Sequence, residues 1–88
     1  MSTPIGKKIR EIREGLKLGR QAFCDQTGIA KSTLIGIETA GKEPGFKILK
    51  AITNTWPEYT LWLMNDTVMP EAGQISPEIE ETRRSEAG

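Results

Sequence analysis

The sequence predicts an all-α fold, in which residues 1–66 form a compact five-helix domain and residues 67–88 form a short acidic tail. Apolar residues recur every three or four positions, which is the period of an amphipathic helix. Glycine and proline residues separate these stretches, and no stretch alternates as a half-buried strand does. A chain of 88 residues is long enough for one domain.

The first helix is expected over about residues 4–15. Ile5, Ile9 and Ile12 follow one another at spacings of four and three, so they form one apolar stripe. Pro4 suits the first turn of a helix, where a missing backbone N–H removes no hydrogen bond. This helix is therefore expected to face the core with its isoleucines.

The second helix is expected over about residues 20–27, with Phe23 and Cys24 buried. Gly28 follows it directly. Because glycine adopts a positive φ without strain, it ends the helix and permits a sharp turn.

The third helix is expected over about residues 31–39. At 100° per residue, Thr33, Leu34 and Ile37 lie on one side, which is expected to face the core. The opposite side carries Lys31, Ser32, Ile35, Gly36 and Thr39. An isoleucine and a glycine on an outward helical face require an explanation, because glycine costs a helix about 1 kcal/mol relative to alanine.

Two more helices are expected, over about residues 45–55 and 57–65. Phe46, Leu49 and Ile52 are in register in the first of them. The second holds Tyr59, Leu61, Trp62, Leu63 and Met64. Beyond residue 67 the chain is rich in proline, glycine and acidic residues, which predicts a mostly disordered tail. Within this tail, Ile75 and Ile79 are suited to docking on another surface.

The composition argues against an enzyme, a metal site and a cofactor. The chain has no histidine and a single cysteine, so neither a cysteine–histidine pair nor a disulfide within the chain is available. Cys24 is interpreted as a small packing residue. No apolar run reaches the roughly 20 residues that span a membrane, and no signal peptide is recognisable. A cytoplasmic protein associated with the nucleoid, without a membrane partner, is expected.

The zero net charge conceals an asymmetry. Residues 1–50 carry ten basic and five acidic side chains, whereas residues 51–88 carry two basic and seven acidic ones. The basic half suits a polyanion such as nucleic acid, and the alternative is that both halves are ordinary solvated surface.

A helix-turn-helix pattern runs through residues 20–37, which read RQAFCDQTGIAKSTLIGI. The small Cys24 allows two helices to approach each other, Gly28 makes the bend, and the apolar Ile29 follows at once. Two further apolar residues, five and eight positions after Ile29, can hold the second helix against the first. This arrangement predicts a helix-turn-helix.

Around this pattern the chain resembles the Xre/Cro/CI-like helix-turn-helix family of bacterial and phage transcription regulators. The resemblance covers about residues 5–65, with IREIREGLKLGR before the pattern and GKEP and PEYTLWL after it. It implies a lambda-repressor-like DNA-binding domain with residues 31–39 as the recognition helix. It also implies a structural ion pair between Arg13 and Glu38.

Three residues depart from the family pattern. Arg20 replaces the usual Gln, Ala30 replaces a Ser or Thr helix cap, and Gly36 replaces a long polar side chain that often reads bases. Loss of the cap costs about 1 kcal/mol. Arginine still reaches a phosphate, and a glycine lets the helix lie deeper in the major groove.

The resemblance implies two sets of DNA contacts. Base edges are expected to meet Lys31, Ser32, Ile35, Gly36 and Thr39, with Ile35 against a thymine methyl. Phosphates are expected to meet Arg20, Gln21, Lys42, Lys47 and Lys50. Lys7, Lys8 and Lys17 are interpreted as solvated surface.

The expected function is that of a small Cro-like or prophage-type repressor, which binds a palindromic operator in double-stranded DNA as a homodimer. The dimer interface is expected at Trp56, Tyr59, Trp62 and Met64, although the tryptophans can equally complete the core. Two alternatives are an antitoxin whose acidic tail binds a toxin protein and a helical protein-interaction module without DNA binding.

Overall fold

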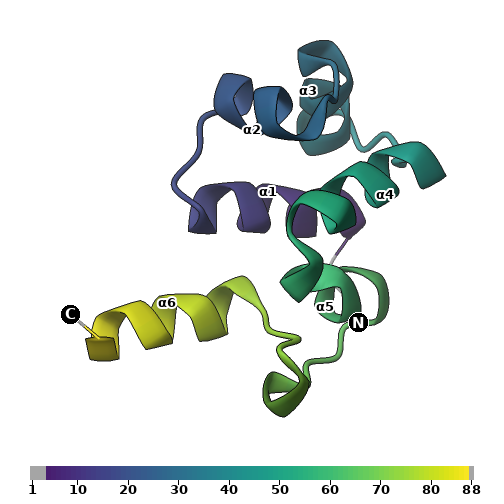
Figure 1. The fold of residues 1–88 in the computed structure, drawn as a ribbon. Helices are drawn as coiled ribbons and strands as arrows, with labels where there is room; N and C mark the ends of the chain where they lie inside the picture. The colour runs from purple at the N-terminus through teal and green to yellow at the C-terminus, as the bar shows by residue number, and fades with distance from the viewer. Residues whose placement is uncertain (1–3, 88) are drawn as a thin grey trace.

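The structure is a computed structural model that describes residues 4–87, in which six α-helices and two 3₁₀ turns follow one another (Figure 1). The elements are α1 (Ile5–Gly15), α2 (Arg20–Thr27), α3 (Lys31–Thr39), α4 (Phe46–Thr55), η1 (Pro57–Tyr59), α5 (Thr60–Asn65), η2 (Pro70–Ala72) and α6 (Pro77–Ala87). The described residues form no strand, only an isolated antiparallel bridge between Met69 and Gln74. The predicted all-α class is therefore confirmed.

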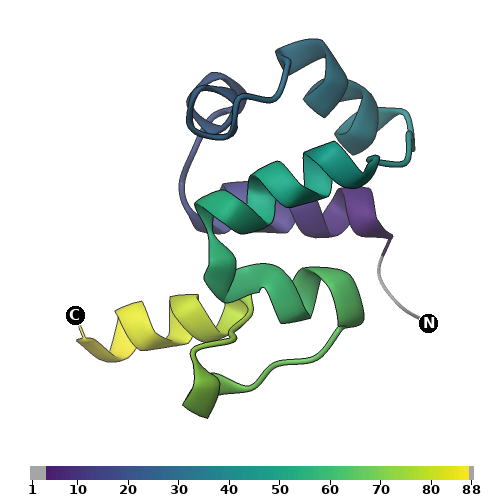
Figure 2. The same ribbon diagram turned by 45° about the vertical axis from the view of Figure 1, so that its right-hand side comes forward.

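Helix α1 lies at the centre of the molecule and contacts α3, α5 and α6. Helix α2 packs on α3 and α4. Two views of the ribbon place the α2–α3 pair at one end of the molecule and α6 at the other (Figures 1 and 2). The two ends therefore present different surfaces, separated by the core.

The core contains the apolar stripes that the sequence predicted. Ile9, Ile12, Leu34 and Ile52 have no exposed surface. The ring of Phe23 stacks on Trp56 with 5.1 Å between centroids, which ties α2 to the end of α4. Two predictions are wrong here: Thr33 is exposed rather than facing the core, and Phe46, at the first position of α4, is 77% exposed.

A glycine fixes how closely α1 approaches α3. A Cβ atom at Gly6 would lie 2.5 Å from the backbone oxygen of Ile37, closer than van der Waals contact allows. The crossing of these two helices therefore requires glycine at this position, which the periodicity of the sequence did not indicate.

Lys8 is buried, whereas the sequence predicted a solvated side chain. Its Nζ donates to the carbonyl oxygen of Trp62 at 3.0 Å and forms an ion pair with Asp66. The same Nζ lies 5.3 Å from the centre of the Trp62 ring, within the range of a cation–π contact. These partners replace the water that a buried ammonium group loses, so Lys8 joins α1 to the end of α5. Lys7 and Lys17 are exposed, as expected.

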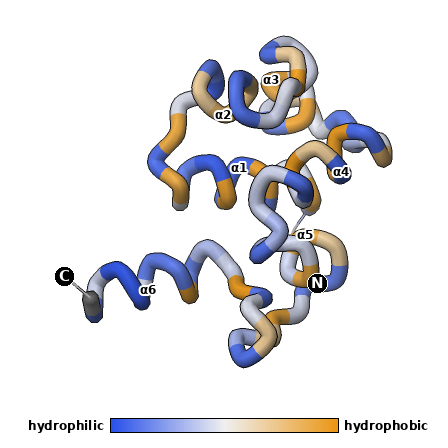
Figure 3. The backbone as a smooth tube through the Cα atoms, in the orientation of Figure 1, coloured by the Kyte–Doolittle hydropathy of each residue, from blue (hydrophilic) through white to orange (hydrophobic). Residues whose placement is uncertain are grey.

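The acidic tail also differs from its prediction, because residues 77–87 form α6 and α6 packs on α1. Ile75 is buried, and its N–H donates to the carbonyl oxygen of Glu58 at 2.9 Å. Arg84 donates to the carbonyl oxygen of Gly15 at 2.8 Å. The helix is otherwise mostly hydrophilic (Figure 3). A few specific contacts are therefore enough to order a segment of disorder-like composition, while the domain boundary at residues 66–67 stays a prediction.

Candidate nucleic-acid interface

The α2–α3 pair has the geometry of a helix-turn-helix. Gly28 ends α2 with φ at +80°, and its N–H donates to the carbonyl oxygen of Cys24 at 2.8 Å. Ile29 turns inward and is buried beside Cys24, as predicted from the spacing. Burial raises the pKa of the Cys24 thiol, which keeps it protonated and suits a packing role.

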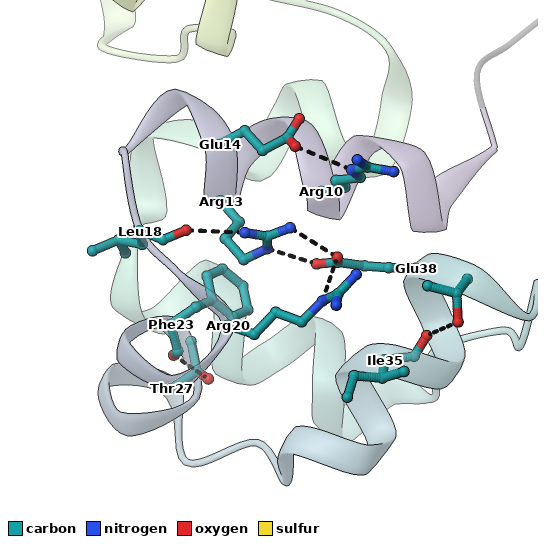
Figure 4. Close-up of polar contacts among 10 residues, drawn as sticks. Arg10, Arg13, Glu14, Leu18, Arg20, Phe23, Thr27, Ile35 and Glu38 are labelled. Atoms are coloured by element: carbon teal, nitrogen blue, oxygen red, sulfur yellow. Dashed lines mark hydrogen bonds and ion pairs between the residues drawn. The ribbon is translucent and has the colours of Figure 1, made fainter.

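An ion-pair network holds α3 against α1 and α2 (Figure 4). Two guanidinium nitrogens of Arg13 contact the Glu38 carboxylate at 2.9 and 3.0 Å, which confirms the predicted pair. Arg20 Nε reaches the same carboxylate at 3.2 Å. The carboxylate has no exposed surface. Burial alone would raise the pKa of Glu38, but the two guanidinium groups outweigh it and hold that pKa below its ordinary value.

Arg20 was predicted to contact a phosphate, and the structure gives it a contact within the domain as well. Its Nε is engaged with Glu38 and its side chain is 32% exposed. Arg20 therefore helps to position α3, and its contact with a phosphate stays a prediction. The neighbouring Gln21 is exposed, and its amide donates to Asp25 at 2.9 Å.

The outward face of α3 contains most of the predicted base-reading residues. Lys31, Ser32, Ile35 and Thr39 are exposed side by side on this helix. The Thr39 hydroxyl donates to the carbonyl oxygen of Ile35 at 2.7 Å, so its oxygen remains available as an acceptor. The newly exposed Thr33 adds a second hydroxyl near the start of the helix.

Gly36 differs from the prediction that it leaves the helix face open. It is half-buried, and an added Cβ would lie 3.1 Å from Cδ of Lys42. The Lys42 side chain therefore covers this position. No side chain caps the start of α3, as expected from Ala30.

The remaining predicted phosphate contacts are exposed lysines around α3 and α4. Lys42 lies in the loop after α3, and Lys47 and Lys50 lie on α4. Within the chain from residue 4 to residue 87, the ion pairs involve none of these three lysines. Their charges are available to an external anion.

The predicted dimer interface is partly wrong. Trp56 and Tyr59 are buried in the core of the same chain, with 8% and 2% of their surface exposed, so they offer no area to a partner. Trp62 is half-buried over Lys8. Only Met64 is well exposed, at 53%.

An apolar patch at the predicted interface contains the exposed side chains of Phe46 and Met64, and Val68 and Met69 are exposed further along the chain. Between Phe46 and Met64 runs a groove of about 160 Å³, which Leu49 and Thr53 also line. The sequence grouped Phe46 with the apolar stripe of its helix, whereas the structure exposes its side chain at this groove. Exposed apolar patches of this kind typically mark interaction sites.

No helix in the described part of the chain is both long enough and apolar enough to cross a membrane.

Comparison with known proteins identifies similar proteins from phages. The chain is 36% identical to Repressor protein C of Escherichia phage P2 over 81 residues, which cover 90% of this chain and 82% of that protein. It is also similar to the solved structure of Pf6r from the filamentous phage Pf6 of Pseudomonas aeruginosa PA01, with a TM-score of 0.77 and 30% identity over 98% of this chain and all of the other. No family model matches the sequence.

Proposed function

The chain belongs to the phage-repressor family of helix-turn-helix proteins, and on this premise we propose that it represses transcription by binding a palindromic operator as a homodimer. The observation that carries the proposal is the outward face of α3. Polar and apolar side chains are exposed there, while the opposite face and Glu38 are anchored in the domain. A helix held in this way presents a fixed surface to a major groove.

Each exposed residue on α3 has a chemical counterpart on the edges of base pairs. Lys31 donates to guanine O6 or N7, and Ser32 donates or accepts. Ile35 contacts the methyl group of thymine, the one apolar group on the major-groove edge. Thr39 lies two turns beyond Lys31 and accepts at the far end. This assignment explains why an isoleucine is exposed on a polar helix.

Phosphate contacts come from residues beside α3. Gln21 lies in the first turn of α2, whose free N–H groups favour an anion, and Lys47 and Lys50 lie on α4. Such contacts set affinity and orientation without reading sequence. The acidic helix α6 lies at the opposite end of the molecule, where it does not repel the DNA (Figures 1 and 2).

The homodimer is proposed to form through the apolar patch rather than through the buried aromatic residues. We propose that the two-fold axis passes through this patch and leaves both recognition helices on one side of the dimer. Half-sites about 34 Å apart, one turn of DNA, are then expected. A two-fold contact is self-complementary, and the groove beside Met64 offers space for the partner's Phe46.

Selection of bound DNA from a random pool tests the proposal. A symmetric site with half-sites one turn apart is expected. Lys31→Ala with Ser32→Ala should weaken binding to the selected site without changing the melting temperature, because both side chains are exposed. The matched control is Arg83→Ala with Ser85→Ala on α6, which removes one cationic side chain and one hydroxyl from the other end. Capture of no oligonucleotide at low ionic strength would refute the function.

A salt titration separates the proposal from a protein-interaction module without DNA binding. Specific DNA binding weakens steeply with salt, because cationic side chains release counterions from the phosphates. A protein-interaction module shows no such dependence with any duplex. The antitoxin alternative, in which the acidic tail binds a toxin protein, is tested by pull-down of a co-expressed partner, and loss of that partner on deletion of residues 67–88 would favour it.

A further inference from the structure

The outward face of α3 has a gap at its centre. Ser32, Gly36 and Thr39 follow one another at spacings of four and three residues and therefore form one stripe. Lys31 and Ser32 occupy the start of this face and Thr39 its end, but Gly36 contributes no side chain to the middle. Ile35 lies beside this stripe and is assigned to a thymine methyl, but position 36 itself contributes no contact from the helix.

Lys42 fills the gap from outside the helix. The Cδ, Cε and Cγ atoms of Lys42 would lie 3.1, 3.7 and 3.8 Å from a Cβ atom added at Gly36. Three carbons of the lysine stem thus lie against the glycine at ordinary packing distance or slightly closer. A side chain at position 36 and this path of Lys42 compete for the same space.

The loop after α3 is shaped to bring Lys42 back over the helix. Gly41 adopts φ +67°, a left-handed conformation that favours glycine. The N–H of Lys42 then donates to the carbonyl oxygen of Gly36 at 3.3 Å, and that of Ala40 donates to the same oxygen at 3.0 Å. These hydrogen bonds therefore hold the backbone of Lys42 beside Gly36, the residue that the Lys42 side chain covers.

We propose that Lys42 is a base-reading residue, which supplies from the loop the side chain that α3 lacks at Gly36 and donates from Nζ to O6 or N7 of a guanine. This inference rests on the proposed function. The ion pairs within residues 4–87 do not include Lys42, so its ammonium group is available. Lysine and arginine donating to guanine O6 and N7 form the commonest specific contact in the major groove.

The position of the stem distinguishes Lys42 from the lysines that contact phosphates. Lys47 and Lys50 lie on α4, which flanks the recognition helix. The Lys42 stem instead packs over Gly36, a position on the outward stripe of α3 itself. Because its stem packs on α3 itself, Lys42 accompanies this helix into a major groove.

The test is Lys42→Met, which keeps an unbranched apolar stem over Gly36 and removes the charge. Lys47→Met removes the same charge from α4 and serves as the matched control. Binding is measured to the selected operator and to its single-base variants at every position of the half-site. Lys42→Met should lose about tenfold of the preference for guanine at one base pair per half-site. Lys47→Met should weaken all sequences alike and lower the salt slope by about 1.

A double variant tests the same point by a gain of preference. Gly36→Gln with Lys42→Ala places a helix side chain where the lysine lay, and glutamine pairs with adenine. The base pair that preferred guanine should then prefer adenine, with a helical circular-dichroism spectrum like that of the wild type. If Lys42→Met binds too weakly to score, measurement at lower salt restores the complex, since phosphate contacts strengthen there.

The results separate this inference from the proposed function. A wild-type chain that selects no DNA site refutes the function. A wild-type chain that selects a site, together with a Lys42→Met variant whose base preferences match those of Lys47→Met, refutes only the base-reading role. Loss of preference confined to one base pair supports both.

Discussion

Replacing Glu38 by glutamine should destabilise the domain by about 2–3 kcal/mol at pH 7, a large part of a typical total of about 5–15 kcal/mol. Removing one partner of a buried ion pair costs about 3–5 kcal/mol, since the other charge is left uncompensated. The carboxylate is fully buried and the Arg13 side chain is only 11% exposed. The cost expected for Glu38→Gln lies at or just below the lower end of this range, about 2–3 kcal/mol. Arg13 keeps its bond to the carbonyl oxygen of Leu18, and Arg20 has access to water, so neither charge is left fully uncompensated.

The pH dependence of this effect has a definite sign. The pKa of Glu38 in the folded chain lies below the ordinary value of 4.5, since Arg13 and Arg20 outweigh the opposing effect of burial. As the pH falls below 4.5, the unfolded chain therefore takes up the proton first, and folding loses the contribution of this carboxylate. The contribution is complete above pH 4.5 and disappears as the pH falls through the folded pKa.

Urea unfolding of wild type and Glu38→Gln between pH 7 and pH 3 measures both quantities. The difference in unfolding free energy should be about 2–3 kcal/mol at pH 7 and should shrink below pH 4.5. Glu14→Gln is the matched control, because its ion pair with Arg10 is about half exposed and such pairs contribute at most about 1 kcal/mol. Equal stability of the two variants at pH 7, or a difference that stays constant down to pH 3, would refute the reasoning.

Four further substitutions test the close packing of helices, the core and the dimer interface separately. Gly6→Ala should destabilise the fold by about 1–3 kcal/mol in thermal unfolding, because the added Cβ meets the backbone of Ile37. Gly36→Ala is the control, because its added Cβ meets only the flexible side chain of Lys42. It should be neutral or should stabilise the fold by up to about 1 kcal/mol. Trp56→Ala should cost about 3–5 kcal/mol in urea unfolding through loss of its stack on Phe23; a smaller loss than for Phe46→Ser would contradict the core assignment. Phe46→Ser should leave unfolding of the monomer nearly unchanged and shift sedimentation from dimer to monomer; an unchanged dimer would exclude the apolar patch as the interface.

The first five helices were predictable because each carries its own apolar stripe and its own stop signal. Gly28 and the isoleucines of α1 act locally, so the sequence alone places them correctly. Helix α6 lacks a strong stripe, and its acidic composition suggested disorder. A local signal was nevertheless present: the Ser76 hydroxyl accepts from the N–H of Ile79 at 3.2 Å, and Pro77 follows this cap at the first helical position.

Residues whose role depends on a distant partner could not be predicted. Lys8 is buried because α5 ends above it and offers a carbonyl oxygen and a carboxylate 54 and 58 positions away in the chain. Arg20 turns inward because Glu38 lies within its reach. Residue type alone does not distinguish a core aromatic side chain from an interface one, and for this reason Trp56 was left open between the two and Phe46 was grouped with the apolar stripe of its helix.

The difference between charges paired inside the domain and charges exposed at its surface explains how a chain without net charge can present a surface for DNA. Arg13 and Arg20 neutralise the buried Glu38 in the basic half, so they count toward the charge of that half but contribute little at the surface. Lysines on α3, on α4 and in the loop between them remain unpaired among the described residues, whereas the acidic residues of α6 lie at the far end (Figure 1). Since exposed charges separated by more than about 10 Å are largely screened at 0.1 M salt, the recognition helix presents the charge of its own end and not the total.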